Sequence, residues 1–145
     1  MLSARKSHAQ TSDTQMLPRH RLIWKRAVLW TLQGWLAMFY SAAGFAKLTE
    51  PQSNLHILIP WSTFVDRSLV SAAGWLEILW SAGMLLPLFS SMMFTPVMRV
   101  CAMAIFGWSV CFALIHALLS QPGLIAVNVI LAGLAATVIL MSGER

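Results

Sequence analysis

The fold class follows from residues 97–119, which read VMRVCAMAIFGWSVCFALIHALL, with one arginine near the start and one histidine near the end. A helix needs about 20 mainly apolar residues to cross the ~30 Å hydrocarbon core of a bilayer. Because lipid offers no hydrogen-bond partner, a backbone that crosses it must form a helix or a closed barrel. The stretch lacks the period-two alternation of a barrel strand. It therefore predicts a transmembrane helix.

Three further stretches have the same character, at about residues 27–46, 69–88 and 124–141. The connection from the second span to the third and the one from the third to the fourth are short, and short connections make neighbouring helices antiparallel. We therefore predict an all-α fold, an integral membrane antiparallel four-helix bundle over residues 27–141.

The composition agrees with this prediction. Hydrophobic residues make up 58% of the chain and charged residues 10%, against ~45–50% and about 25% in soluble domains. A soluble fold could not cover so much apolar surface with so few charges. These values exclude a disordered chain and argue against a soluble enzyme.

The basic residues predict the orientation. Six of the ten lysines and arginines precede the first apolar stretch, so residues 1–26 are predicted to be a basic cytoplasmic tail. Together with Arg99 and Arg145 they put eight basic residues on one side of the bundle, against Lys47 and Arg67 on the other. The positive-inside rule therefore places both termini in the cytoplasm. The partner of this charge is the lipid bilayer and not nucleic acid, because no folded module carries a basic face.

A polar stripe runs along the first span. Gln33, Tyr40 and Lys47 are spaced by seven residues, and seven residues turn a helix through about 700°, back to nearly the same face. Polar groups at membrane depth usually face the bundle interior. We therefore expect the stripe to point inward, with Leu36, Met38 and Phe45 outside or flanking it.

Glu77, His116 and Asn128 supply polar groups from the other spans. From the span directions, Glu77 lies about 12 Å deep and His116 about 5 Å, in the half of the membrane that also holds Tyr40 and Lys47. We predict one polar pocket for protons or a ligand, opening toward the long first connection. Burial favours a neutral Glu77 and a nearby Lys47 favours an ionised one, and the sequence leaves both states open.

Each of these residues also has a purely structural interpretation, as a packing hydrogen bond or a boundary anchor. Glu77, His116 and His56 do not form a metal-ligand set, so we expect no metal. Among the tryptophans, 24, 30, 61 and 108 are expected at the interfaces, and 35, 75 and 80 between helices.

Three short motifs carry a family resemblance. The first span closes with Gly44-Phe45-Ala46-Lys47-Leu48, the second holds Gly74-Trp75-Leu76-Glu77-Ile78-Leu79, and the third ends in Ala113-Leu114-Ile115-His116. This order resembles the DoxX-like family of small four-helix bacterial membrane proteins, over about residues 27–140. The resemblance implies a bacterial cytoplasmic (inner) membrane, a link with membrane redox systems, and polar roles for Lys47, Glu77 and His116.

Three functions remain open. The first is a redox-associated membrane subunit, in which Tyr40 and His116 hydrogen-bond the carbonyl oxygens of a quinone head group and Glu77 exchanges protons with it, beside a partner redox protein. The second is a non-catalytic partner that assembles or stabilises another membrane protein. The third is a small solute or proton carrier. The sequence assigns no catalytic residue.

Overall fold

The computed structural model describes residues 4–89 and 95–143, and this part of the chain contains helices and no strand. The prediction of an all-α fold is confirmed. The elements are α1 (Ala4–Thr49), α2 (Gln52–Leu58), the 3₁₀ helix η1 (Pro60–Phe64), α3 (Arg67–Phe89), α4 (Thr95–Leu118) and α5 (Pro122–Gly143).

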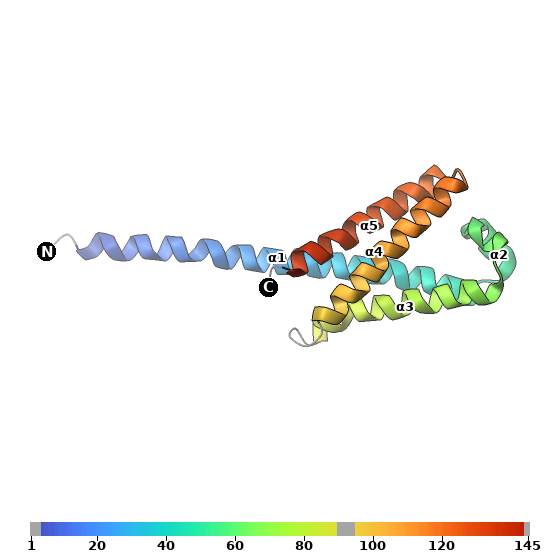
Figure 1. Cartoon of the computed structure of the whole chain (residues 1–145). Coiled ribbons are helices and arrows are strands. Elements are labelled where there is room, and N and C mark those ends of the chain that lie inside the picture. The colour runs from blue at the N-terminus through green and yellow to red at the C-terminus, as the bar shows by residue number, and fades with distance from the viewer. Residues whose placement is uncertain (1–3, 90–94, 144–145) are drawn as a thin grey trace.

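The long helices pack as two pairs. α1 lies along α3, and α4 lies along α5; α3 also contacts α4, and α1 contacts α5 less extensively. Figure 1 shows that the two pairs converge toward the end where the C-terminus lies and diverge toward the end where α2 lies. α2 lies at the end where the two pairs diverge.

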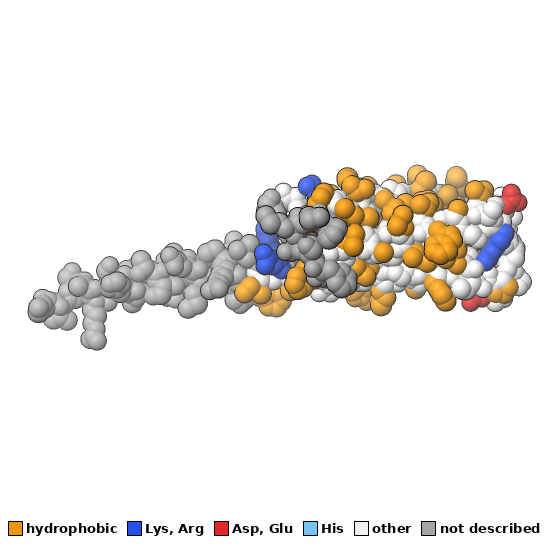
Figure 2. Space-filling view, turned by 90° about the horizontal axis from the view of Figure 1, so that it is seen from below, with side chains coloured by type: hydrophobic (Ala, Val, Ile, Leu, Met, Phe, Trp, Pro, Cys, Tyr) orange, Lys and Arg blue, Asp and Glu red, His pale blue; other side chains and the backbone are white. Residues whose placement is uncertain are grey.

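The surface has an apolar zone between two charged ends. Figure 2 shows hydrophobic side chains over the length of the bundle, with lysines and arginines near both ends and acidic residues at the end away from the N-terminal part of α1. Such a zone is what a membrane-embedded bundle exposes to lipid.

Three helices of the described chain, rather than four, are long and apolar enough to cross a membrane: α3 over Arg67–Pro87, α4 over Pro96–Leu118 and α5 over Pro122–Gly143. The expected first span, 27–46, lies in α1 and is helical. It does not reach the same apolarity, because Gln33, Tyr40 and two tryptophans dilute its aliphatic residues.

α1 is much longer than a membrane span. Its 46 residues correspond to about 69 Å at ~1.5 Å per residue, roughly twice the hydrocarbon core. The polar segment before residue 27 is therefore a continuation of this helix, which projects beyond the bundle (Figure 1). Its predicted cytoplasmic location stays a prediction.

The stripe on α1 faces inward as expected. Gln33, Tyr40 and Lys47 are 1%, 3% and 6% exposed, whereas Met38 and Phe45 face outward. Leu36, expected outside or flanking, is completely buried. It lies three residues after Gln33 and four before Tyr40, which places it on their face.

Two tryptophans do not pack where the sequence reasoning placed them. Trp35 and Trp75 were expected between helices, but both are exposed on the outer surface. Trp80 does pack between helices, edge-on to Trp108 with ring centroids 5.3 Å apart. Depth along a span therefore did not predict which face of the helix a tryptophan occupies.

Candidate functional site

Two glycines set the distance between α1 and α3. A Cβ on Gly44 would lie 2.6 Å from the backbone oxygen of Gly74, and a Cβ on Gly74 would lie 2.9 Å from that of Gly44. Only glycine permits this approach, because any side chain would collide with backbone. Lys47 and Glu77 each follow their glycine by three residues, and the close crossing therefore brings their side chains together.

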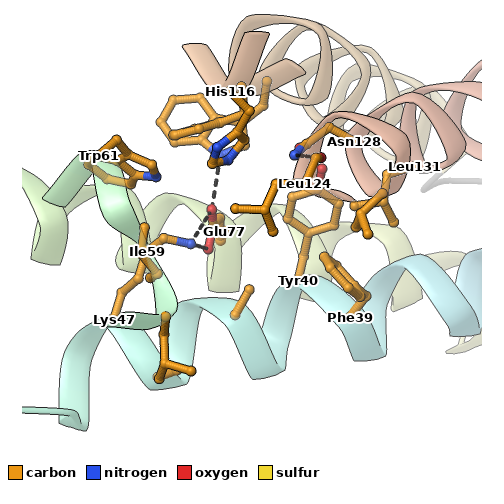
Figure 3. A pocket seen from close by; sticks show the side chains of 16 residues that line it. Phe39, Tyr40, Lys47, Ile59, Trp61, Glu77, His116, Leu124, Asn128 and Leu131 are labelled. Atoms are coloured by element: carbon orange, nitrogen blue, oxygen red, sulfur yellow. Dashed lines mark hydrogen bonds and ion pairs between the residues drawn. The ribbon is translucent and has the colours of Figure 1, made fainter. Parts of the chain in front are cut away.

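Lys47 and Glu77 form a buried ion pair. Lys47 Nζ donates to Glu77 Oε1 at 2.8 Å and to Oε2 at 2.6 Å, and the two side chains are 7% and 3% exposed. Trp108 Nε1 donates to Oε1 at 2.9 Å. Dashed lines in Figure 3 join the Lys47 ammonium to the Glu77 carboxylate. Of the two states left open by the sequence, this geometry matches the ionised carboxylate, which accepts all three bonds.

Tyr40 on α1 is hydrogen-bonded to Ser109 on α4. Its hydroxyl lies 2.6 Å from Ser109 Oγ, and Ser109 Oγ itself donates to the backbone oxygen of Ile105 at 2.8 Å. Because the serine proton is used in that bond, the Tyr40 hydroxyl is the donor of the pair.

His116 and Asn128 each make one bond that orients them. His116 Nδ1 lies 2.7 Å from Gln121 Oε1, so this nitrogen carries a proton and donates it to the amide oxygen. Asn128 Nδ2 donates to the backbone oxygen of Leu124 at 2.8 Å. No further hydrogen bond joins His116 Nε2 or Asn128 Oδ1 to the described residues.

These side chains border one cavity of about 270 Å³. All five predicted pocket residues line it: Tyr40, Lys47, Glu77, His116 and Asn128. Figure 3 shows them reaching toward a common space from α1, α3, α4 and α5. Gln33 does not line it. It lies deeper on the stripe, donating to Met98 Sδ, with its amide oxygen unpartnered among the described residues.

The first connection lies against the cavity, on the side toward which the pocket was predicted to open. Leu58, Ile59 and Trp61 form part of the wall, and the Trp61 ring lies 5.1 Å from that of Phe112 on α4. The connection therefore covers part of the cavity at the end where the helix pairs diverge.

The sequence reasoning missed three residues of this site. Trp108, expected at a membrane interface, is a donor to Glu77; Ser109 and Gln121 hold Tyr40 and His116. Trp108 could have been found from its spacing, because it precedes His116 by eight residues, with Phe112 halfway between, and residues four apart share a helix face.

The site is a partly open, largely apolar cavity with a few polar groups. Among residues 23–87 and 96–143, whose side chains the structure describes, no cluster of three or more histidines, cysteines or acids could hold a metal ion. What the arrangement can do is exchange hydrogen bonds with a small polar group among mainly apolar side chains.

Fold and site together define a helical membrane protein with a polar chamber between its helices. A comparison with protein families matches residues 31–138, about three quarters of the chain, to the DoxX-like family. The chain belongs to the DoxX-like family. Searches of curated proteins and of solved structures found no significant match.

Proposed function

We propose that this protein is a redox-associated membrane subunit whose cavity holds the polar head of a lipid-soluble quinone-type molecule. The observation that carries the proposal is the cavity of about 270 Å³ whose wall is mainly apolar and aromatic, with the Lys47–Glu77 pair at its boundary. Ligand sites commonly combine apolar walls with a few placed polar groups. Ionisable residues within a membrane usually mark such sites.

Each polar group has a role in this proposal. His116, through its Nε2, and Tyr40, through its hydroxyl oxygen, hydrogen-bond the head group, and both line the cavity. Glu77 is the group that exchanges protons, and Lys47 and Trp108 hold its carboxylate in place. The electrons would come from a partner redox protein, because no side chain of the site is a redox carrier.

The proposed setting is the bacterial inner membrane. α1, α3, α4 and α5 would cross it as an antiparallel four-helix bundle with both termini in the cytoplasm. Support comes from the apolar zone between charged ends (Figure 2) and from the eight-to-two distribution of basic residues.

Cysteine labelling tests this orientation. Ser53→Cys and Ser12→Cys are each made in a chain whose Cys101 and Cys111 are replaced by serine. An impermeant maleimide is expected to label Ser53→Cys in intact spheroplasts and Ser12→Cys only after lysis. The reverse pattern would invert the proposed topology.

Binding is tested on protein purified from its own membranes and reconstituted in nanodiscs. We expect mass spectrometry of the extract to find a quinone, and added decyl-benzoquinone to quench tryptophan fluorescence saturably, since Trp61 and Trp108 line the cavity. Leu131→Trp places bulk in the cavity wall and should abolish saturable binding. Leu140→Trp, on the exposed side of the same helix, should preserve it. Equal binding to both variants would refute the proposal.

A second candidate has one observation in its favour. The Lys47–Glu77–Trp108 cluster joins α1, α3 and α4, which is also what a non-catalytic assembly partner needs from a rigid scaffold. In that case Leu131→Trp would leave every cellular phenotype unchanged, while substitutions on the outer surface, such as Trp75→Ala, would release a co-purifying membrane protein.

A further inference from the structure

The cavity has an opening whose border is apolar. Three of its lining residues reach the outer surface: Phe39 on α1 is 37% exposed, Leu58 on α2 58% and Val127 on α5 39%. The ionisable and hydroxyl groups that line it are all buried, none more than 6% exposed. The ionisable part of the chamber is therefore inside, Asn128 is half-buried, and the apolar part faces out.

This opening faces lipid. Phe39 and Val127 lie within the stretches predicted to cross the membrane, and α1 contacts α5 less extensively than its own partner α3. The helix pairs also diverge toward this end (Figure 1). A molecule that extends through the opening passes from the chamber directly into hydrocarbon and not into water.

The hydrogen-bond inventory limits the head group. Trp108 uses its single N–H donor on Glu77 and Tyr40 its single O–H donor on Ser109, whereas Lys47 uses two of its three N–H donors on Glu77 and Asn128 one of its two amide N–H donors on Leu124. Two acceptors at the cavity have no partner in the described chain, namely Asn128 Oδ1 and the Nε2 of a His116 ring whose Nδ1 proton is donated to Gln121, and one N–H each of Lys47 and Asn128 is also left over. The chamber therefore favours a head whose hydroxyl groups both donate and accept hydrogen bonds, because a head with acceptors alone would leave His116 Nε2 and Asn128 Oδ1 unpaired.

From these two observations we infer that the cavity takes the reduced, hydroquinone form of a chain-bearing ligand, with the head inside and the alkyl chain passing between Phe39 and Val127 into the bilayer. This inference rests on the proposed function and specifies its ligand. The Lys47–Glu77 pair is neutral as a whole, which matches an uncharged head.

The head group is tested by competition. Radiolabelled decyl-hydroquinone is bound to the full-length protein in nanodiscs under argon, with empty nanodiscs as the blank. It is then displaced by three unlabelled competitors: decyl-hydroquinone, its dimethyl ether and decyl-benzoquinone. The ether and the quinone keep the chain and lose both donors, and we expect them to compete at least ten-fold more weakly. In His116→Leu the difference should shrink. Equal competition by all three would overturn the hydroquinone assignment.

The opening is tested by a matched pair of variants. Val127→Trp fills the border of the opening, whereas Val129→Trp adds the same bulk on an exposed part of α5 that does not line the cavity. We expect Val127→Trp to slow association of decyl-hydroquinone at least ten-fold and Val129→Trp to leave it unchanged. A decyl-hydroquinone with a diazirine at the chain end should label α1 and α5 beside Phe39 and Val127, in a manner blocked by unlabelled ligand.

The outcomes distinguish a failure of the lateral opening from a failure of the proposed function. Saturable binding that ignores Val127→Trp, with no competable label on α1 or α5, would refute the lateral opening and leave the cavity as a ligand site. Binding that Leu131→Trp does not weaken, or no saturable binding of either oxidation state, would refute the proposed function itself.

Discussion

Replacing Lys47 by methionine should destabilise the protein severely, because it strands a buried carboxylate. Glu77 Oε2 accepts its hydrogen bond from Lys47, and Oε1 would keep Trp108 as its donor. Exposed ion pairs contribute about 0–1 kcal/mol, but side chains that are 7% and 3% exposed belong to the buried class. Removing one partner of a buried pair costs about 3–5 kcal/mol. We expect a loss of that size in the free energy of unfolding for Lys47→Met.

The second substitution identifies the cause. Adding Glu77→Gln to Lys47→Met removes the stranded charge and leaves an amide oxygen that can still accept from Trp108. The double variant should therefore recover about 1–3 kcal/mol relative to Lys47→Met. Glu50→Gln is the matched control, since Glu50 bonds Asn54 on the surface and should change stability by less than about 1 kcal/mol.

The measurement is reversible unfolding in bicelles, followed by steric trapping or by titration with denaturing detergent. A cost below about 1 kcal/mol for Lys47→Met would place the pair in the exposed class. It would show that the pair is hydrated in the membrane and that the account of a desolvated Glu77 carboxylate is wrong. A double variant less stable than Lys47→Met would refute the stranded charge as the cause.

Two further substitutions test the packing around the site. Gly44→Ala should lower the free energy of unfolding by about 1–3 kcal/mol or more, because the new methyl group would lie 2.6 Å from the Gly74 oxygen. Gly107→Ala, where a Cβ would meet open space, should instead raise it by up to about 1 kcal/mol. Thermal unfolding in detergent measures both variants, and equal effects would contradict the close crossing of α1 and α3. Trp108→Phe keeps an aromatic ring and loses the donor to Glu77, and should cost about 1–3 kcal/mol in the same unfolding measurement, against about 0.5 kcal/mol or less for the exposed Trp75→Phe. If both tryptophan variants unfold alike, the bond to Glu77 contributes nothing.

The periodicity of the sequence predicted which residues share one face of a helix, but it did not predict which residues of different helices are in contact. The seven-residue spacing of Gln33, Tyr40 and Lys47 fixed a common face, and all three are buried. The same geometry applies to Leu36, whose burial follows from its spacing to Gln33 and Tyr40. The burial of Gln33, Tyr40 and Lys47 could therefore be predicted from their spacing. The spacing of Leu36 also predicts its burial, although we expected it outside or flanking the stripe.

The partners of the polar groups could not be predicted in the same way. Glu77 meets Lys47 because two glycines on separate helices touch, and Trp108 reaches Glu77 because α4 packs beside α3. These contacts depend on helix rotation and register, which composition and spacing leave free. The position of the first connection likewise depends on the contact of Trp61 with Phe112. No sequence pattern near residue 61 predicts a contact with a residue about fifty positions away.

The divergence of the helix pairs has a mechanical consequence. Because the α1–α3 and α4–α5 pairs are close at one end and apart at the other, a small rotation of one pair against the other moves the separated ends most. Bilayer thickness acts on helix tilt, and a change in tilt would widen or narrow the chamber while leaving the opposite end of the bundle nearly still. The membrane around this protein would then act as a regulator of what the chamber can hold.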